Sequence, residues 1–215
     1  MERAMIAAAM VMLAASNAAW ALNRPPTLEH PQRKASSLVG QPLPELSGPA
    51  ALSPGLLTLQ KYTHDLVLLK GPDGKLLYEN GRPKMRLDTY ALVMNFFATY
   101  CAPCVREIPT FNKIAQSYPG QPVKFLYVNV DVEKSEEEVK AFALKKGISV
   151  EMLFPSVSRT IKEYQIDSLP RIVVADRNGT IRKVVMGFQE DLTAQLDREI
   201  KDILSNKPGK AGTVK

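Results

Sequence analysis

The chain has 215 residues, of which 45% are hydrophobic, so it can hold one domain with extensions or at most two small domains. Its formal net charge is +6, but Lys and Arg alternate with Asp and Glu along most of the chain, and no DNA- or RNA-recognition motif accompanies them. We therefore interpret the charge as solvated surface and expect no nucleic-acid partner.

Residues 1–21 have the pattern of a secretory signal peptide. Arg3 precedes an apolar stretch over residues 4–15, and Ala19-Trp20-Ala21 supplies a small-residue cleavage site. The stretch is shorter than the roughly 20 apolar residues that a membrane-spanning helix needs. We expect a periplasmic or otherwise extracytoplasmic protein that is soluble after cleavage. An uncleaved amphipathic anchor, which would leave the protein membrane-anchored, and an ordinary buried helix remain open as alternatives.

Residues 22–89 are expected to form a lead-in and an insertion packed on the core. The first part, 22–53, is rich in Pro with few periodic apolar residues, which predicts an extended chain. The second part predicts a β-hairpin over 65–78, in which the turn 71–74 separates two apolar runs. Whether this insertion docks a partner stays open.

Residues 90–204 predict strands alternating with helices. Strands are expected at 90–98, 123–130, 171–175 and 180–186, and helices at 101–117, 135–146, 158–164 and 192–204. A tail at 206–215 is expected to be disordered. The alternation, closed by a hairpin and a helix, predicts an α/β fold with a central mixed sheet.

The chain has only two cysteines, Cys101 and Cys104. A bridge between them closes a very short loop and contributes only about 2 kcal/mol to stability, so a chemical role is favoured over a structural one. Cys101 falls where a buried strand gives way to a helix, and the helix N-terminus favours a thiolate there. We expect Cys101 to be exposed with a lowered pKa, and Cys104 to be more buried. Pro103 is tolerated in the first helical turn.

Half of a zinc site is the alternative for a Cys-x-x-Cys pair. Structural zinc needs four ligands, whereas His30 and His64 stand apart at no motif spacing. We expect both histidines to be surface residues and no metal to be bound.

The segment 93–109, VMNFFATYCAPCVREIP, resembles the active-site segment of thioredoxin-like proteins. It is most similar to the TlpA/ResA family, which includes exported reductases of cytochrome c maturation. The resemblance covers about residues 36–205 and weakens over 52–89. It implies a thioredoxin-like fold, in which a core at 90–205 has a central mixed β-sheet flanked by helices and follows an N-terminal extension with a β-hairpin.

The resemblance also implies roles for individual residues. Cys101 matches the attacking cysteine and Cys104 the resolving one, so the cofactor is the redox-active disulfide itself. Pro170 matches a cis-proline that faces the disulfide, and Pro109 a proline that kinks the helix. Glu107 matches an acidic residue that assists proton movement. One turn beyond Cys104, a partly buried carboxylate would have a raised pKa and could exchange protons with the thiol, whereas a solvated helix charge is the alternative.

Three residues depart from the family pattern. Asn95 replaces the buried aspartate of ordinary thioredoxins and cannot titrate. Tyr100 replaces the usual tryptophan, and Arg171 follows the cis-proline where a small residue is common. We expect Tyr100 and Arg171 to line the substrate surface. The other residues expected there are Ala102, Pro103, Leu169 and Pro170.

These features together predict an exported thiol-disulfide oxidoreductase, expected to be a monomer. The resemblance implies that it reduces protein disulfides such as that of apocytochrome c, with electrons from a membrane thiol transporter. An oxidase of secreted proteins and a binding module without turnover remain open alternatives. A peroxidase is disfavoured because no third cysteine is present.

Overall fold

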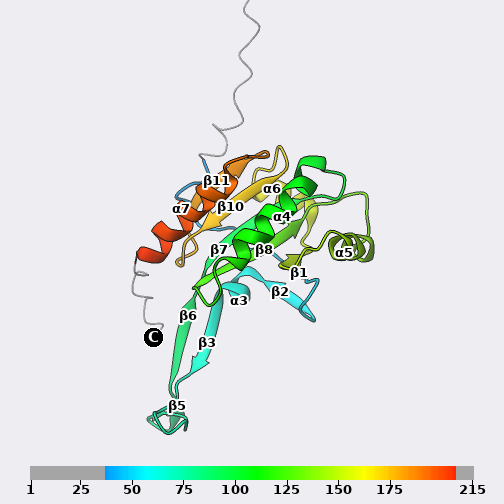
Figure 1. Ribbon diagram of the computed structural model, residues 1–215. Helices are drawn as coiled ribbons and strands as arrows, with labels where there is room; N and C mark the ends of the chain where they lie inside the picture. The colour runs from blue at the N-terminus through cyan, green and yellow to red at the C-terminus, as the bar shows by residue number, and fades with distance from the viewer. Residues whose placement is uncertain (1–36, 207–215) are drawn as a thin grey trace, which may run out of the picture. The chain divides into compact units, whose positions relative to one another are not determined.

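A computed structural model describes residues 37–206. The expected signal peptide, His30 and nearly all of the expected tail lie outside this range. The centre of the fold is a five-stranded sheet in the order β11-β10-β7-β8-β9 (Figure 1). The bounds are β7 Ala91–Phe97, β8 Val123–Asn129, β9 Glu151–Leu153, β10 Arg171–Ala175 and β11 Ile181–Met186. Strands β7, β8 and β9 run parallel, whereas β10 is antiparallel to both β7 and β11, which confirms the mixed sheet.

Both faces of the sheet are covered, which explains why β7 is apolar throughout. Val93 and Phe97 belong to the core on the side of α4 (Ala102–Gln116), α5 (Glu136–Lys145) and α7 (Leu192–Ser205). Met94 and Phe96 point the other way, into the core that α3 (Leu59–Thr63) and α6 (Val157–Glu163) help to close. Alternate side chains of a strand face opposite sides, so a strand covered on both faces reads as one continuous apolar run.

The lead-in contains more regular structure than its sequence predicts. Near the end of the segment 22–53, which we expected to be extended, β1 (Ser47–Pro49) forms a short hairpin with β2 (Leu56–Thr58), which lies just beyond that segment. β9 was also missed as the fifth strand of the sheet. Its first residue, Glu151, interrupts the apolar pattern, yet it is buried because its carboxylate accepts hydrogen bonds from Leu52 N (2.8 Å) and Ser53 Oγ (2.6 Å).

The predicted hairpin over 65–78 is wrong in its return strand. β3 (His64–Leu68) pairs with β6 (Met85–Thr89), not with the apolar run at 76–78. The turn at 71–74 does form, with Gly74 N donating to Gly71 O (2.9 Å). A second turn, formed by the two residues Asn80-Gly81, then joins β4 (Tyr78–Glu79) to β5 (Arg82–Pro83) and reverses the direction of the chain. Asn-Gly is a strong hairpin signal that our prediction overlooked.

We call the paired strands β3 and β6 the ribbon, and residues 69–84 its tip. In Figure 1 the ribbon extends away from the central sheet. Its base is closed by Tyr90 N, which donates to Thr63 O (2.9 Å), and is joined to the core by Arg177 Nε, which donates to Thr89 O (3.0 Å). Among residues 37–206, every helix is too short or too polar to cross a membrane.

Candidate active site

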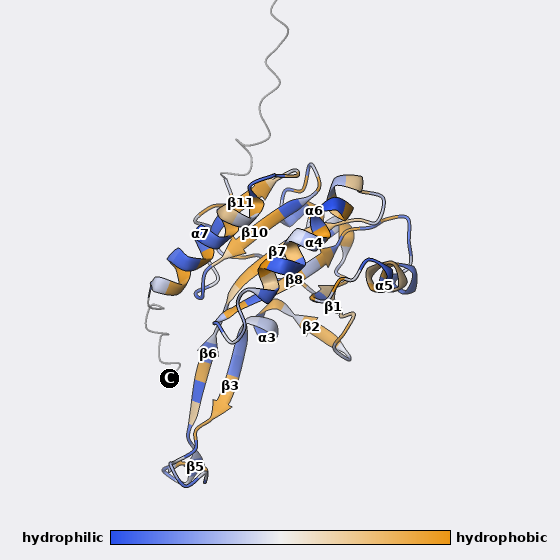
Figure 2. Cartoon of the chain, in the orientation of Figure 1, coloured by the Kyte–Doolittle hydropathy of each residue, from blue (hydrophilic) through white to orange (hydrophobic). Residues whose placement is uncertain are grey.

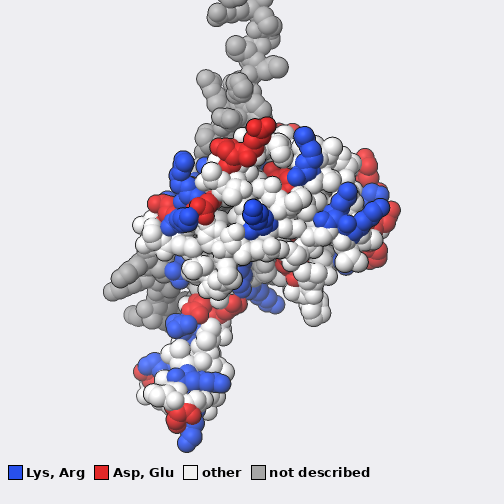
Figure 3. Space-filling view, viewed as in Figure 1, with Lys and Arg blue, Asp and Glu red and all other residues white. Residues whose placement is uncertain are grey.

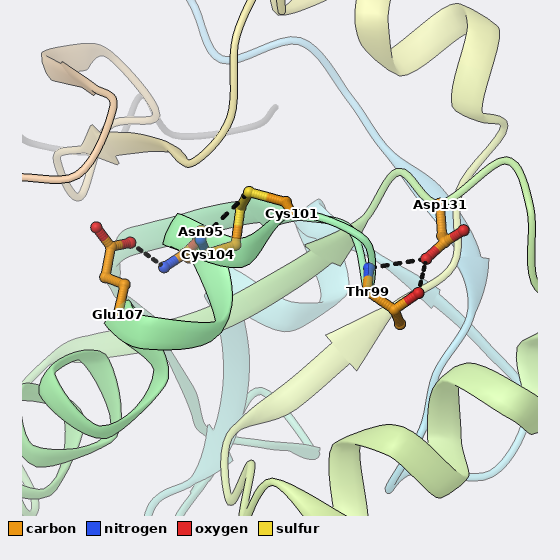
Figure 4. Close-up of a disulfide and its surroundings, with 6 residues drawn as sticks. All are labelled: Asn95, Thr99, Cys101, Cys104, Glu107 and Asp131. Carbon is orange, nitrogen blue, oxygen red and sulfur yellow. Dashed lines mark hydrogen bonds between the residues drawn. A yellow bond between two sulfur atoms is a disulfide. The ribbon is translucent and has the colours of Figure 1, made fainter.

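Cys101 and Cys104 form a disulfide at the start of α4 (Figure 4). Cys101 is the N-cap residue, and its Sγ accepts a hydrogen bond from the backbone N–H of Cys104 (3.2 Å). Pro103 occupies the first turn, where a missing N–H leaves no intrahelical bond unmade. The helix continues through Pro109 to Gln116. An N–H at a helix N-terminus that points at sulfur would favour the thiolate of Cys101 once the disulfide is reduced.

The two sulfurs differ in burial in the expected order, but Cys101 is less exposed than predicted. Cys101 is 8% exposed and Cys104 is 2% exposed. The prediction of an exposed Cys101 is wrong because its Sγ folds back over the first turn of α4. Its neighbours are open to solvent, since Tyr100 is 51% exposed and Ala102 is exposed.

Glu107 lies one turn beyond Cys104 and is 1% exposed, so the alternative of a solvated charge is wrong. Its Oε1 accepts a hydrogen bond from Asn95 Nδ2 (2.8 Å), and within the described residues its Oε2 has no partner. Burial raises the pKa of Glu107 to about 7, although the Asn95 bond opposes the shift. The carboxylate can thus take up or release a proton at neutral pH. Asn95 contributes by donating to Glu107 rather than by titrating.

The peptide bond between Leu169 and Pro170 is cis, as the resemblance implied. The next residue, Arg171, pairs with Phe96 near the end of β7, which brings the cis-proline beside the turn that carries Cys101. Leu169 packs against the same core cluster as the two cysteines. Pro170 O accepts a hydrogen bond from Gly187 N (2.8 Å), so the loop after β11 is tied to the cis-proline.

Arg171 does not line the substrate surface, contrary to the prediction. Its side chain is fully buried, and its one hydrogen-bond partner among the described residues is Asp167, with Nη1 3.3 Å from Oδ1. Burial lowers the pKa of Arg171, and Asp167 opposes that shift. The reason is strand alternation: Ile172 points to the face that holds the cysteines, so Arg171 points to the opposite one.

A second buried carboxylate, Asp131, holds the other side of the active-site turn and was not predicted. Its Oδ2 accepts hydrogen bonds from the Thr99 backbone N (2.8 Å) and from Thr99 Oγ1, while Oδ1 accepts from Glu133 N (2.9 Å) and Lys134 N (3.2 Å). Burial raises the pKa of Asp131, but these bonds outweigh it and the pKa lies below its ordinary value. Figure 4 shows the Thr99–Asp131 and Asn95–Glu107 pairs to either side of the disulfide. Since parallel strands end at one edge of a sheet, an acidic residue directly after β8 was the available signal.

Arg106 and Phe188 form a cation–π contact that the sequence did not predict. The guanidinium carbon of Arg106 lies 4.8 Å from the centre of the Phe188 ring, which is 39% exposed. Phe188 follows Gly187, the residue bonded to Pro170, so it lies close to the cis-proline. The two residues are 82 positions apart and no local pattern links them.

Within residues 37–206, no group of three or more His, Cys, Asp or Glu side chains is placed to hold a metal ion.

Comparisons with known proteins identify the family of the chain. The AhpC/TSA family model matches residues 70–184, more than half of the chain. Thiol-disulfide oxidoreductase ResA of Geobacillus thermodenitrificans is 31% identical over 131 residues, covering 59% of this chain and 74% of that protein. ResA of Geobacillus kaustophilus is 29% identical, covering 62% and 73%.

A solved structure shows the same fold. The thioredoxin domain of a thiol-disulfide oxidoreductase from Bacteroides vulgatus aligns with a TM-score of 0.57 at 14% identity, covering 75% of this chain and 97% of that one. At this identity the likeness supports the thioredoxin-like fold alone. The family match and the ResA relatives show that the chain belongs to the AhpC/TSA family and is a thiol-disulfide oxidoreductase of thioredoxin-like fold. Cys101 and Cys104 form a cysteine pair of the redox-active type.

Proposed function

We propose that the protein is an exported reductase of protein disulfides. The observation that carries the proposal is the Cys101–Cys104 disulfide at a helix N-terminus, with a buried carboxylate of raised pKa one turn behind it. The ResA relatives imply protein thiols and disulfides as substrates. Export rests on the signal-peptide pattern of residues 1–21.

In the reduced protein, the Cys101 thiolate attacks one sulfur of a substrate disulfide. A mixed disulfide forms, and the second substrate sulfur leaves as a thiolate that takes up a proton. Cys104 then loses its proton and attacks Cys101 Sγ, which releases the first substrate sulfur. Two electrons have passed from the cysteine pair to the substrate. A membrane dithiol transporter would return them, and an apocytochrome c would be the substrate.

Glu107 would receive the proton of Cys104. A buried thiol resists ionisation, so an acceptor of similar proton affinity at neutral pH lowers the cost of the resolving step. The pKa of about 7, and an Oε2 that has no hydrogen-bond partner in the described part of the chain, give Glu107 that capacity. Tyr100, Ala102, Pro103, Leu169 and Pro170 would form the surface on which the substrate lies.

Trapping tests the proposal. Cys104→Ser leaves the mixed disulfide unresolved, so the proteins caught on Cys101 in the native host can be identified by mass spectrometry, with the double variant Cys101→Ser/Cys104→Ser as the control. Cytochrome c precursors caught by the single variant alone would support the reductase. A broad set of secreted proteins would instead indicate an oxidase. Recovery of nothing above the control would contradict catalysis and favour a binding module.

A further inference from the structure

The ribbon has an apolar face that the described part of the chain leaves uncovered. Its register pairs Leu66 with Leu87 and Leu68 with Met85. Because residues two apart in a strand share a face, all four side chains lie on one side of the ribbon. They are 70%, 46%, 46% and 56% exposed in the order Leu66, Leu87, Leu68, Met85. Figure 2 shows apolar residues along both of its strands. Contiguous exposed apolar surface of this kind marks contact with a partner or a membrane.

The opposite face of the ribbon carries three charged side chains and one valine. Asp65 pairs with Asp88, and Val67 with Arg86. These charges are satisfied locally, since Arg86 Nε lies 2.6 Å from Asp88 Oδ1, and Lys124 Nζ on β8 lies 3.1 Å from Asp65 Oδ2. The ribbon is therefore amphipathic, with one face left for contact.

The tip adds an aromatic residue and positive charge. Leu77 is 42% exposed and Tyr78 is 62% exposed. Residues 69–84 include four basic and two acidic side chains, an excess of two positive charges. Figure 3 shows basic groups on the tip, with acidic groups among them, beyond an uncharged stretch of surface. Exposed apolar side chains, a tyrosine and a basic surround are the features of an element that lies at the interface of an anionic membrane.

The size of the face argues against a second copy as its occupant. A stable dimer uses about 20 residues or more on each side, whereas this face offers four side chains on two five-residue strands. Contact with a lipid surface does not require an interface of that size. We propose that the ribbon docks the protein onto an anionic phospholipid surface, with Leu66, Leu87, Leu68 and Met85 in the headgroup boundary.

This docking leaves the disulfide free. The ribbon joins the start of β7 through Thr89 and Tyr90, whereas Cys101 follows the other end of the same strand. The two lie at opposite ends of β7, so the ribbon can contact lipid while Cys101 remains accessible. Changes on the ribbon face should therefore leave disulfide reduction in solution unaltered.

A site-specific fluorophore tests the proposal in the full chain. Trp20→Phe removes the single tryptophan, and Leu87→Trp then places an indole on the apolar face. The probe is vesicles of equal parts phosphatidylcholine and phosphatidylglycerol, with and without brominated acyl chains. We expect the indole emission to shift to shorter wavelength and to be quenched by bromine, less so on phosphatidylcholine alone and at high salt. The matched control, Val67→Trp, places the indole on the polar face and should stay unquenched.

Because the readout is local, lipid binding by another segment cannot mimic it. An indole at position 87 that stays unquenched on anionic vesicles would overturn the proposal, as would equal quenching on the two faces. A lipid-independent shift that rises with protein concentration, with a dimer in sedimentation velocity, would overturn it in favour of a second copy. Insulin-disulfide reduction by the same variants reports on the proposed function separately, so each can fail without the other.

Discussion

The two ends of β7 differ in which residues are buried: carboxylates are buried at one end, and apolar side chains are exposed at the other. At the disulfide end, the carboxylates of Glu107 and Asp131 are buried, and their surroundings shift their pKa values in opposite directions. At the ribbon end, leucines are exposed and charges lie at the surface. Electrostatic effects are strong where water is excluded and weak where it is not. Substitutions at the first end should therefore change chemistry and stability, and those at the second should change neither.

The largest effect is expected from the cysteines. Cys101→Ser removes the attacking sulfur and should abolish reduction of insulin disulfides, because the cysteine that remains, Cys104, is only 2% exposed. Cys104→Ser should retain attack but stop at the mixed disulfide, which a mass shift on non-reducing analysis reports. Insulin reduction by Cys101→Ser above the uncatalysed rate would show that catalysis does not depend on the cysteine site at the end of β7.

The second-largest effect on activity is expected from Glu107→Gln. Loss of a positioned proton acceptor should slow turnover by about 100-fold, and it should remove the rise in the resolving rate as pH passes through about 7. The measurement is the pH profile of single-turnover resolution. A Glu107→Gln profile that coincides with wild type would mean that Glu107 has only a structural role.

The same variant has a predicted stability signature. The pKa of Glu107 is raised from 4.5 to about 7, so the folded state binds more protons in that window and its stability falls as pH rises through it. The loss is about 3 kcal/mol at pH 8 relative to pH 4. Glu107→Gln should lack this loss and so be more stable than wild type at pH 8. Urea unfolding of both proteins at the two pH values tests it, and parallel pH dependences would contradict it.

Asp131→Asn should act on stability more than on chemistry. The change weakens bonds from Thr99, Glu133 and Lys134 to a charged acceptor and should cost about 2 kcal/mol at pH 7. The pKa of Asp131 is lowered in the folded state, so its contribution is present above the ordinary carboxyl pKa and is lost as pH falls through the folded value. The difference from wild type in urea should therefore shrink in acid. A constant difference would point to packing instead.

The smallest effect belongs to the ribbon. Leu66→Ser changes a side chain that is 70% exposed, so unfolding free energy should shift by less than about 0.5 kcal/mol, with insulin reduction unchanged. A destabilisation above about 2 kcal/mol would mean that the ribbon face is covered by part of the chain and that the contrast between the ends of β7 is false.

The sequence predicted the core and the cysteine site well because their signals are local. The apolar run of β7 and the helical spacing after Cys101 each lie within one element. The features that it missed depend on distant contacts. Asp131 with Thr99, and Arg106 with Phe188, meet only after the sheet forms.

Two errors had local causes. Arg171 was placed on the substrate surface because only its position after Pro170 was considered, whereas strand alternation directs it to the other face. The return strand of the ribbon was misassigned because the first turn signal, 71–74, masked the stronger Asn80-Gly81.

The most direct test is the pH dependence of alkylation of the reduced protein by iodoacetamide, with the modified cysteine assigned by mass spectrometry. A thiolate stabilised at the start of α4 should make Cys101 react first, with a midpoint well below the unperturbed value of about 8.5, while Cys104 stays protected. A midpoint near 8.5 at Cys101, or faster modification of Cys104, would contradict the assignment of the attacking sulfur.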